Sequence, residues 1–254
     1  MKQSLLTLVL LALLNGLPTH AQRPGPDRID TKKGPLLVQP VSHASLVLTW
    51  DNKTIYVDPS GGPEAYAGLN PPDLVLITDI HGDHCDTKTL AGLNTAKATF
   101  VGPQAVADKL TETARARVVV LPNGDKTQQA GVTITAVPMY NLPETPDSRH
   151  PKGRGNGYVL DLGGKQVYLS GDTEDIPEMR ALKNIDVAFV CMNLPYTMDV
   201  DQAAAGVLAF KPKIVYPYHY RGQNGLSDVE AFRKAVAAGK ASVDVRLRNW
   251  YPAQ

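Results

Sequence analysis

Two carboxylates and two imidazoles gather in the stretch Asp79-Ile-His81-Gly-Asp83-His84, directly after an apolar run. Side chains two residues apart in an extended segment point the same way, so Asp79 and His81 can bind one divalent cation. The glycine between the pairs permits a sharp turn, after which Asp83 and His84 can face a second cation. The alternative is a solvated loop at the start of a helix, with Asp86 as its N-cap.

Two later strand-like segments also end in metal-binding side chains. The first leads into Gly171-Asp172-Thr173, and the second, Lys213-Ile-Val-Tyr-Pro-Tyr, leads into His219. A carboxylate has two oxygens, so Asp172 can bridge two cations and offset part of their charge. His219 can complete the ligands of the second cation. Each residue alone is weak evidence, but separate strand ends that offer aspartate and histidine predict one shared metal site.

The composition is typical of one globular domain that can position such a site. The chain has 254 residues, of which 43% are hydrophobic and 20% charged, so it can bury a substantial core. Its formal net charge is +1, and no basic run is interleaved with aromatic residues, so nucleic acid is not an expected partner. A small-molecule substrate is expected, and the sequence does not indicate an oligomeric state.

The N-terminal segment has the pattern of a secretory signal peptide. Lys2 precedes an apolar run from Leu5 to Leu14, and small residues precede the expected cut after Ala21. The run is far shorter than the roughly 20 residues that span a bilayer, so no stable membrane anchor is expected. We therefore predict that residues 1–21 are removed and that the mature chain is periplasmic or secreted. Residues 22–33 predict a flexible leader, and residues 34–254 a single folded domain.

Hydrophobic patterning within 34–254 predicts mixed sheets and helices. Strands are expected at 36–41, 45–50, 54–57, 74–78, 98–101, 118–121, 132–137, 157–162, 166–169, 187–190, 214–217 and 242–247. Helices are expected at 87–93, 104–110, 200–209 and 227–238. The first three strands predict an antiparallel meander, and Gly163-Gly164 predicts a hairpin turn. This order predicts an α/β fold of two mixed β-sheets flanked by helices, because meanders and β-α units each leave one face to bury.

The motifs, in this order, resemble those of the metallo-β-lactamase superfamily. The likeness rests on Thr78-Asp-Ile-His-Gly-Asp-His84, Gly171-Asp-Thr173 and the strand-end His219, and extends from about Leu36 to Tyr251. More narrowly, His43-Ala-Ser-Leu and Ile55-Tyr-Val-Asp-Pro59 resemble the branch with ascorbate-6-phosphate lactonases and phospholipase-D-like enzymes that cleave N-acyl phosphatidylethanolamines. The resemblance implies a single-domain, four-layer αββα sandwich with the site at one edge of the two sheets. It does not fix the substrate.

Two positions depart from the pattern of the family that the chain resembles. Asp79 stands where the family usually has a leading histidine, which makes the first cation site more anionic and shifts its preference toward Mn²⁺ or Fe²⁺, although Zn²⁺ tolerates aspartate. Asn141 stands about where the family has its third histidine, and asparagine is a poor zinc ligand. His150 can replace that imidazole, form an anion-recognition loop with Lys152 and Arg154, or belong to an exposed turn.

Other residues are candidates for supporting roles. His43 is expected to orient a ligand or face the substrate, or to be a structural histidine, and Asp58 to orient a ligand or cap a turn. Tyr196 and Tyr220 lie in loops that the resemblance sets around the pocket, although aromatic packing is the alternative. The two cysteines, Cys85 and Cys191, are expected to be isolated buried thiols, and Cys85 is not expected to bind metal.

These observations predict an exported metal-dependent hydrolase, in which a metal-activated water attacks an ester, lactone or phosphodiester. Zn²⁺ is the expected cofactor, as one ion or two, with Mn²⁺ or Fe²⁺ as alternatives. The predicted ligands are Asp79, His81, Asp83, His84, His150, Asp172 and His219. Asp83 and His84 are also the predicted catalytic residues. The alternatives are an iron-dependent oxidoreductase on the same scaffold and a metal-binding protein without catalysis.

Overall fold

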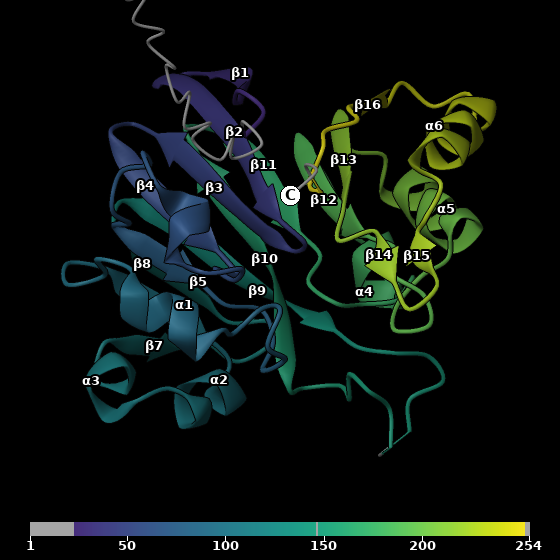
Figure 1. The fold of residues 1–254 in the computed structure, drawn as a ribbon. Helices are drawn as coiled ribbons and strands as arrows, with labels where there is room; N and C mark the ends of the chain where they lie inside the picture. The colour runs from purple at the N-terminus through teal and green to yellow at the C-terminus, as the bar shows by residue number, and fades with distance from the viewer. Residues whose placement is uncertain (1–22, 146, 252–254) are drawn as a thin grey trace, which may run out of the picture.

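Two seven-stranded β-sheets lie face to face in the computed structural model, with helices on their outer sides (Figure 1). The structure describes residues 23–145 and 147–251. The predicted αββα arrangement of two mixed sheets is confirmed. No helix in the described ranges is long and apolar enough to cross a membrane. The predicted signal peptide, residues 1–21, lies outside the described residues.

The first sheet begins with an antiparallel meander and continues with parallel strands. The meander consists of β1 (Asp27–Thr31), β2 (Gly34–Ser42), β3 (Ser45–Trp50) and β4 (Lys53–Val57). The parallel strands are β5 (Leu74–Leu76), β6 (Thr99–Gly102) and β7 (Val118–Val120). The connecting helices are η1 (Pro63–Tyr66), α1 (Thr87–Gly92), α2 (Gln104–Lys109) and α3 (Glu112–Arg115).

The second sheet repeats this plan. Its meander consists of β8 (Lys126–Gln129), β9 (Val132–Met139), β10 (Gly155–Leu162) and β11 (Lys165–Leu169). Its parallel strands are β12 (Val187–Cys191), β13 (Ile214–Tyr218) and β16 (Asp244–Val245). The helices are α4 (Pro177–Arg180), α5 (Val200–Phe210) and α6 (Val229–Ala238), and a small hairpin pairs β14 (Arg221–Gly222) with β15 (Gly225–Leu226).

Local sequence explains the boundaries of several elements. β12 is buried at every position because the other sheet covers one of its faces and helices cover the other. Gly163 and Gly164 have φ of 64° and 81°, the positive values that a two-residue hairpin between β10 and β11 needs. Asp86 caps α1 by accepting from the backbone N–H groups of Lys88 and Thr89. The predicted hairpin is therefore confirmed, and Asp86 caps the helix as the alternative interpretation of the motif proposed.

The expected flexible leader at 22–33 is wrong over residues 27–31, which form β1. Among the five residues of this strand only Ile29 is buried, so hydrophobic patterning gave no strand signal. Tertiary contacts order the strand instead: it pairs with β2, and Asp27 accepts a hydrogen bond of 2.6 Å from Tyr216 in the other sheet. The folded domain therefore begins before Gly34, the predicted boundary.

The main hydrophobic core lies between the two sheets and continues under α5 and α6. Trp250 and Tyr158 are among its largest fully buried side chains. A smaller core packs α1 and α2 against the outer side of the first sheet. The two cysteines, Cys85 and Cys191, are free and buried, as predicted. Two rigid sheets that meet along one edge can hold side chains from several strand ends in fixed positions.

Candidate metal centre

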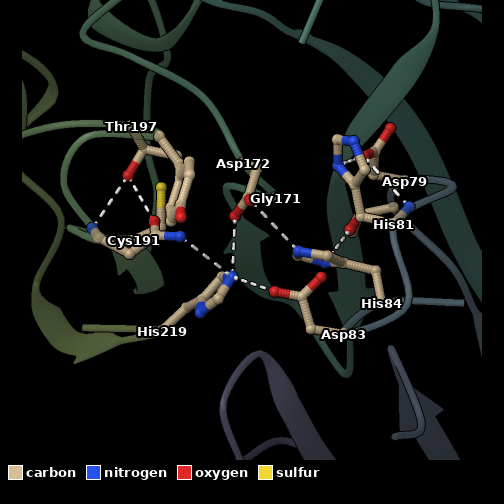
Figure 2. Close-up of polar contacts among 12 residues, drawn as sticks. Asp79, His81, Asp83, His84, Gly171, Asp172, Cys191, Thr197 and His219 are labelled. Carbon is tan, nitrogen blue, oxygen red and sulfur yellow. Dashed lines mark hydrogen bonds and ion pairs between the residues drawn. The ribbon is translucent and has the colours of Figure 1, made fainter. Parts of the chain in front are cut away.

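Polar side chains from five strand ends converge at one edge of the sandwich. The stretch 79–84 follows β5, and Asp172 follows β11. His43 follows β2, Asp58 follows β4 and His219 follows β13. Figure 2 shows the carboxylate of Asp172 between the imidazoles of His84 and His219. The convergence that the sequence predicted is therefore present, and it draws on both sheets.

The turn within residues 79–84 does not depend on the glycine that was expected to permit it. Gly82 does not adopt a positive φ, and a Cβ atom there would have open space around it. The chain instead forms a helix-like turn, in which His84 N–H and Cys85 N–H both donate to the carbonyl of His81. That turn separates the pair Asp79 and His81 from the pair that follows. A glycine is not required for it.

Asp172 is the centre of the cluster. Its Oδ2 atom lies 3.3 Å from Nε2 of His84 and 3.3 Å from Nε2 of His150, and its Oδ1 atom lies 3.3 Å from Nε2 of His219. Oδ2 of Asp83 lies 3.4 Å from the same nitrogen of His219. Gly171, whose φ is 61°, makes the turn that aims this carboxylate, and a Cβ there would meet Met139 Sδ at 2.6 Å.

These donors fit a divalent cation. Ligand atoms bound at about 2.0–2.1 Å in a tetrahedron around zinc lie about 3.3–3.4 Å apart, which matches the spacing around Asp172. Within the described residues, Nε2 of His84, Nε2 of His150 and Oδ1 of Asp172 are buried without a hydrogen-bond partner. Buried polar atoms are rarely left without partners, so these atoms are suited to a cation. Among the described residues, three overlapping donor groups could hold an ion: Asp79, His81 and His150; His84, Asp172 and His219; and His43, Asp83 and His219.

Asp58 fixes the orientation of His84. The carboxylate is fully buried, and it accepts from Thr78 N–H at 2.7 Å and from Thr78 Oγ1 at 2.6 Å. Its Oδ2 atom also lies 2.9 Å from Nδ1 of His84. A proton held on Nδ1 leaves Nε2 with a free lone pair toward Asp172, the usual arrangement of a carboxylate behind a metal-binding histidine. The expected orienting role of Asp58 agrees with this geometry.

His150 occupies the place that the sequence left open. Its side chain is fully buried, so it does not belong to an exposed turn. Asn141 Oδ1 accepts from His150 N–H at 2.8 Å and lies 3.1 Å from its Nδ1. Lys152 pairs with Glu144 and Glu178 on the surface, away from this imidazole. Asn141 therefore stands behind His150 and directs Nε2 toward Asp172, as Asp58 does for His84.

We expect Asn141→Ala to weaken metal binding without unfolding the protein. The substitution removes the acceptor that orients His150, and loss of such a partner typically lowers metal affinity by about 10–100-fold. Titration of the metal-free protein against a competing chelator measures this change. Asn70→Ala, at an exposed loop position, is the matched control and should leave the affinity unaltered. An Asn141→Ala protein with wild-type affinity would show that His150 needs no orienting partner.

Asp79 is paired with Arg154, which belongs to the loop between β9 and β10. Arg154 Nε lies 3.2 Å from Asp79 Oδ1, and Arg154 Nη2 lies 3.3 Å from Asp79 Oδ2. Nδ1 of His81 is 2.5 Å from the same Oδ2 atom. Burial alone would raise the pKa of Asp79, but His81, His84 and Arg154 hold that pKa well below its usual range. The carboxylate that replaces the family's histidine is thus charged and already has a cationic neighbour.

His43 contacts the second ring nitrogen of His219, the one that does not face Asp172. Its Nδ1 lies 3.2 Å from Nδ1 of His43, which in turn is 3.1 Å from the hydroxyl of Tyr251. Burial and the neighbouring His219 lower the pKa of His43 to about 4, so His43 is neutral and can accept a hydrogen bond. Asp58, His43 and His219 have φ of 45°, 51° and 46°, a left-handed conformation that few residues other than glycine adopt. The backbone is therefore strained where strands deliver these side chains.

Opposite charges within the cluster stabilise the charged forms of its aspartates and of His84. Burial alone would raise the pKa of Asp172, but His219 and His84 hold it well below its usual range. Burial would lower the pKa of His84, yet Asp172 and Asp58 raise it well above the usual value. Asp83 also has a lowered pKa, because His219 and His84 outweigh its desolvation. A cation that binds here must therefore displace protons from imidazole nitrogens.

A cavity of about 280 Å³ opens beside the cluster. His43, Asp83, Asp172 and His219 form its metal-site wall, and Tyr196 lines it as expected. In the described structure Tyr220 is not part of the lining: it is buried, and its ring packs 4.9 Å from that of Tyr251. Four further polar residues line the cavity without having been predicted: Arg149, Asn193, Arg221 and Gln223.

No local signal identified these lining residues, because each belongs to an irregular loop or a short hairpin. The same holds for Arg154 as the partner of Asp79, since 75 residues separate the two in sequence.

Several proteins are similar to this chain. A metal-dependent hydrolase of the UPF0173 group from Pyrococcus abyssi is 32% identical over 216 residues, which cover 81% of this chain and 93% of that protein. A solved structure from Parabacteroides distasonis, assigned as a metal-dependent hydrolase, is 40% identical with a TM-score of 0.78, and the match covers 88% of this chain and 97% of that one. Igni18, a metallo hydrolase from Ignicoccus hospitalis, is 24% identical with a TM-score of 0.72, over 86% and 96% of the two chains, and shows likeness of fold.

The two facing mixed sheets, with aspartates and histidines gathered at their shared edge, define a protein of the metallo-β-lactamase fold class. The model of the beta-lactamase superfamily domain matches residues 38–219. The chain belongs to this superfamily, and it is a metal-dependent hydrolase. The narrower branch that the sequence resembles stays a prediction.

Proposed function

We propose that this hydrolase cleaves an ester, lactone or phosphodiester bond in a small molecule, with Zn²⁺ as the preferred cofactor. The observation that carries the proposal is the spacing of 3.3 Å between Asp172 and three imidazole nitrogens, which suits tetrahedral coordination. Three protein carboxylates and four imidazoles are available for one ion or two. The donor set also accommodates Mn²⁺ or Fe²⁺, because Asp79 adds an oxygen ligand.

The residues divide into two binding groups that share one carboxylate. Asp79, His81 and His150 would hold a first cation, and His84, Asp172 and His219 a second. Asp83, which lies 3.4 Å from His219, would join the second group, and Asp172, whose Oδ2 lies 3.3 Å from both His84 and His150, would contribute to both. A bound divalent cation supplies a nucleophilic water at neutral pH and polarises the bond to be cleaved.

The protein's own residues orient the reacting groups. Asp83 is only partly buried and faces both the cavity and His219, so its carboxylate can accept a proton from the attacking water. Asp58 and Asn141 keep His84 and His150 in the required orientation. The new bond joins the water oxygen to the carbonyl carbon or phosphorus, and the leaving alkoxide takes up the proton.

Metal analysis combined with activity profiling tests this proposal. The protein is purified without added metal, its metal content is measured, and esters, lactones and phosphodiesters are assayed after chelation and after return of Zn²⁺, Mn²⁺ or Fe²⁺. We expect turnover to vanish with chelator and to return best with Zn²⁺. Stoichiometric iron with activity only in the presence of oxygen and a reductant would contradict hydrolysis and favour an oxidoreductase.

We also propose that the chain is exported and cleaved after Ala21. The cut is compatible with the described structure, in which Arg23, just beyond it, donates from Nη2 to the carbonyl of Ala65 at 2.6 Å. A cut before Gln22 would leave these contacts in place. N-terminal sequencing of the protein recovered from outside the cytoplasm of an expressing bacterium is the direct measurement, and an intact Met1 would contradict the proposal.

A further inference from the structure

Two arginines that the metal centre does not use line the cavity beside it. Arg149 and Arg221 both border the cavity, together with Asn193, Tyr196 and Gln223. Among the described residues, neither guanidinium group lies within 4.0 Å of a carboxylate oxygen. The other charged loop residues near the site, Lys152 and Arg154, are paired with acidic side chains. Arg149 and Arg221 therefore have no ion-pair partner of their own in the part of the chain that the structure describes, and both present positive charge to the cavity.

Both guanidinium groups are held in place by aromatic rings. The Cζ atom of Arg149 lies 4.4 Å from the centre of the Tyr196 ring, and Cζ of Arg221 lies 4.3 Å from the centre of the Tyr251 ring. Stacking of this kind uses the flat face of the guanidinium and leaves its N–H groups at the edge free to donate. The groups are thus oriented before a ligand arrives, which lowers the entropic cost of binding.

The backbone around the two arginines is fixed as well. The carbonyl of Arg149 accepts from Arg154 Nη2 at 2.5 Å, and the N–H of Arg221 donates to the hydroxyl of Tyr251 at 3.1 Å. The hairpin of β14 and β15 also docks closely on a neighbouring loop, where a Cβ at Gly222 would lie 1.9 Å from the carbonyl oxygen of Leu194. Only glycine permits that approach.

Both arginines are close in sequence to predicted metal ligands. Arg149 directly precedes His150 of the first binding group, and Arg221 follows two residues after His219 of the second. A ligand whose reacting bond lies at the metal centre therefore shares its cavity with both guanidinium groups. The volume of about 280 Å³ corresponds to a small metabolite.

We infer that Arg149 and Arg221 form a subsite for an anionic group, carboxylate or phosphate, so that the enzyme selects small anionic substrates over neutral ones. The inference rests on the proposed hydrolase function for the position of the reacting bond. Guanidinium groups bind carboxylate and phosphate oxygens in the same way, through two parallel hydrogen bonds, so either group fits this subsite. Asn193 and Gln223 add neutral hydrogen-bonding groups to the same wall.

Calorimetric binding to the metal-loaded protein tests the subsite without catalysis. The probes are glutarate, which has two carboxylates, and glutaramate, in which a neutral amide replaces one of them. One carboxylate of each probe can bind at the metal centre, so the comparison reports the other end. We expect glutarate to bind at least about tenfold more tightly, since hydrogen bonds to charged groups contribute that much. A third probe, 3-phosphonopropionate, distinguishes a preference for phosphate from one for carboxylate.

The double variant Arg149→Gln, Arg221→Gln should reduce the glutarate preference to about twofold or less, because no guanidinium then faces the second anionic group. The double variant Arg233→Gln, Lys234→Gln on α6 is the matched control: it also removes two positive charges, from exposed surface positions, and should keep the preference. Equal affinities for glutarate and glutaramate in the wild type, or a preference that persists in the double variant, would overturn the inference. Circular dichroism checks that each variant is folded.

Hydrolysis of phenyl acetate and of phenyl hemisuccinate separates this inference from the proposed function. The two esters share a leaving group and differ in one carboxylate. We expect kcat/KM to favour the hemisuccinate and the ratio to fall in the double variant. A glutarate preference without turnover of any ester, lactone or phosphodiester would sustain the anion subsite and contradict the hydrolase proposal. Turnover of both esters with equal efficiency, without a preference for glutarate, would sustain the hydrolase proposal and contradict the anion subsite.

Discussion

Asp172→Asn is expected to lower metal-dependent hydrolysis by about 10³-fold, since a bound cation contributes several kcal/mol to transition-state stabilisation. The substitution keeps the shape of the side chain but removes the charge that three imidazoles face, each at 3.3 Å. An amide also has only one oxygen with free lone pairs, so it cannot bridge two cations. Metal content per chain, measured by mass spectrometry after dialysis, should fall in parallel with kcat.

Asp51→Asn is the control for this loss of charge. Asp51 is exposed in the turn between β3 and β4 with φ of 49°, a conformation that asparagine also tolerates. Its activity and metal content should match the wild type. Thermal unfolding in the presence of a chelator shows whether Asp172→Asn is folded. A folded Asp172→Asn protein with wild-type metal content and activity would remove this carboxylate from the metal centre.

Regular elements could be predicted from the sequence because their signals are local. The alternation of apolar and polar residues predicted the strands around the core, and the apolar run before Asp79 predicted where the motif lies. The order of the motifs supplied the superfamily and, with it, the four-layer arrangement. β1 escaped prediction because it is ordered by pairing with β2 and by the Tyr216 contact rather than by its own composition.

The candidate site could be predicted in part, for a related reason. Metal-binding residues are recognisable by type and by their position after strands, so Asp172 and His219 were found along with the motif at 79–84. The role of His150 could not be decided, because it depends on how the 15-residue connection between β9 and β10 folds back, and Asn141 holds it there. Loops of this kind are set by tertiary contacts and not by periodicity.

The same connection also delivers Arg154 to Asp79, and this contact changes what the unusual aspartate means. An isolated third carboxylate would make the first cation site strongly anionic. With the guanidinium 3.2 Å from Asp79 Oδ1, much of that charge is already offset. The expected shift toward Mn²⁺ or Fe²⁺ is therefore smaller than the residue type alone predicts, and the two residues act as one unit.

Asp79→His, which gives the histidine that the family usually has here, should therefore harm this protein. Arg154 would lose both acceptor oxygens and face an imidazole. The Asp79 side chain is buried and that of Arg154 is 22% exposed, so breaking this pair should cost less than breaking a fully buried one. We expect the free energy of unfolding to fall by about 2 kcal/mol. The guanidinium charge would also repel a cation, so metal affinity at the first group should fall at least about tenfold. Urea unfolding of the metal-free protein and a competitive chelator titration measure the two effects.

The double variant Asp79→His, Arg154→Met should regain most of both losses, because removal of the guanidinium leaves the imidazole with no cationic neighbour at that position. The effect of the double variant minus the sum of the effects of Asp79→His and Arg154→Met is the coupling energy of the pair in a double-mutant cycle. Arg233→Met provides the comparison, since it breaks an exposed ion pair with Glu230 on α6 that should be worth no more than about 1 kcal/mol. If Asp79→His alone bound metal and unfolded like the wild type, the pair would contribute nothing and Asp79 would act simply as an interchangeable ligand. If the double variant stayed as weak as the single one, the aspartate itself, rather than its pairing with Arg154, would be what the first cation requires.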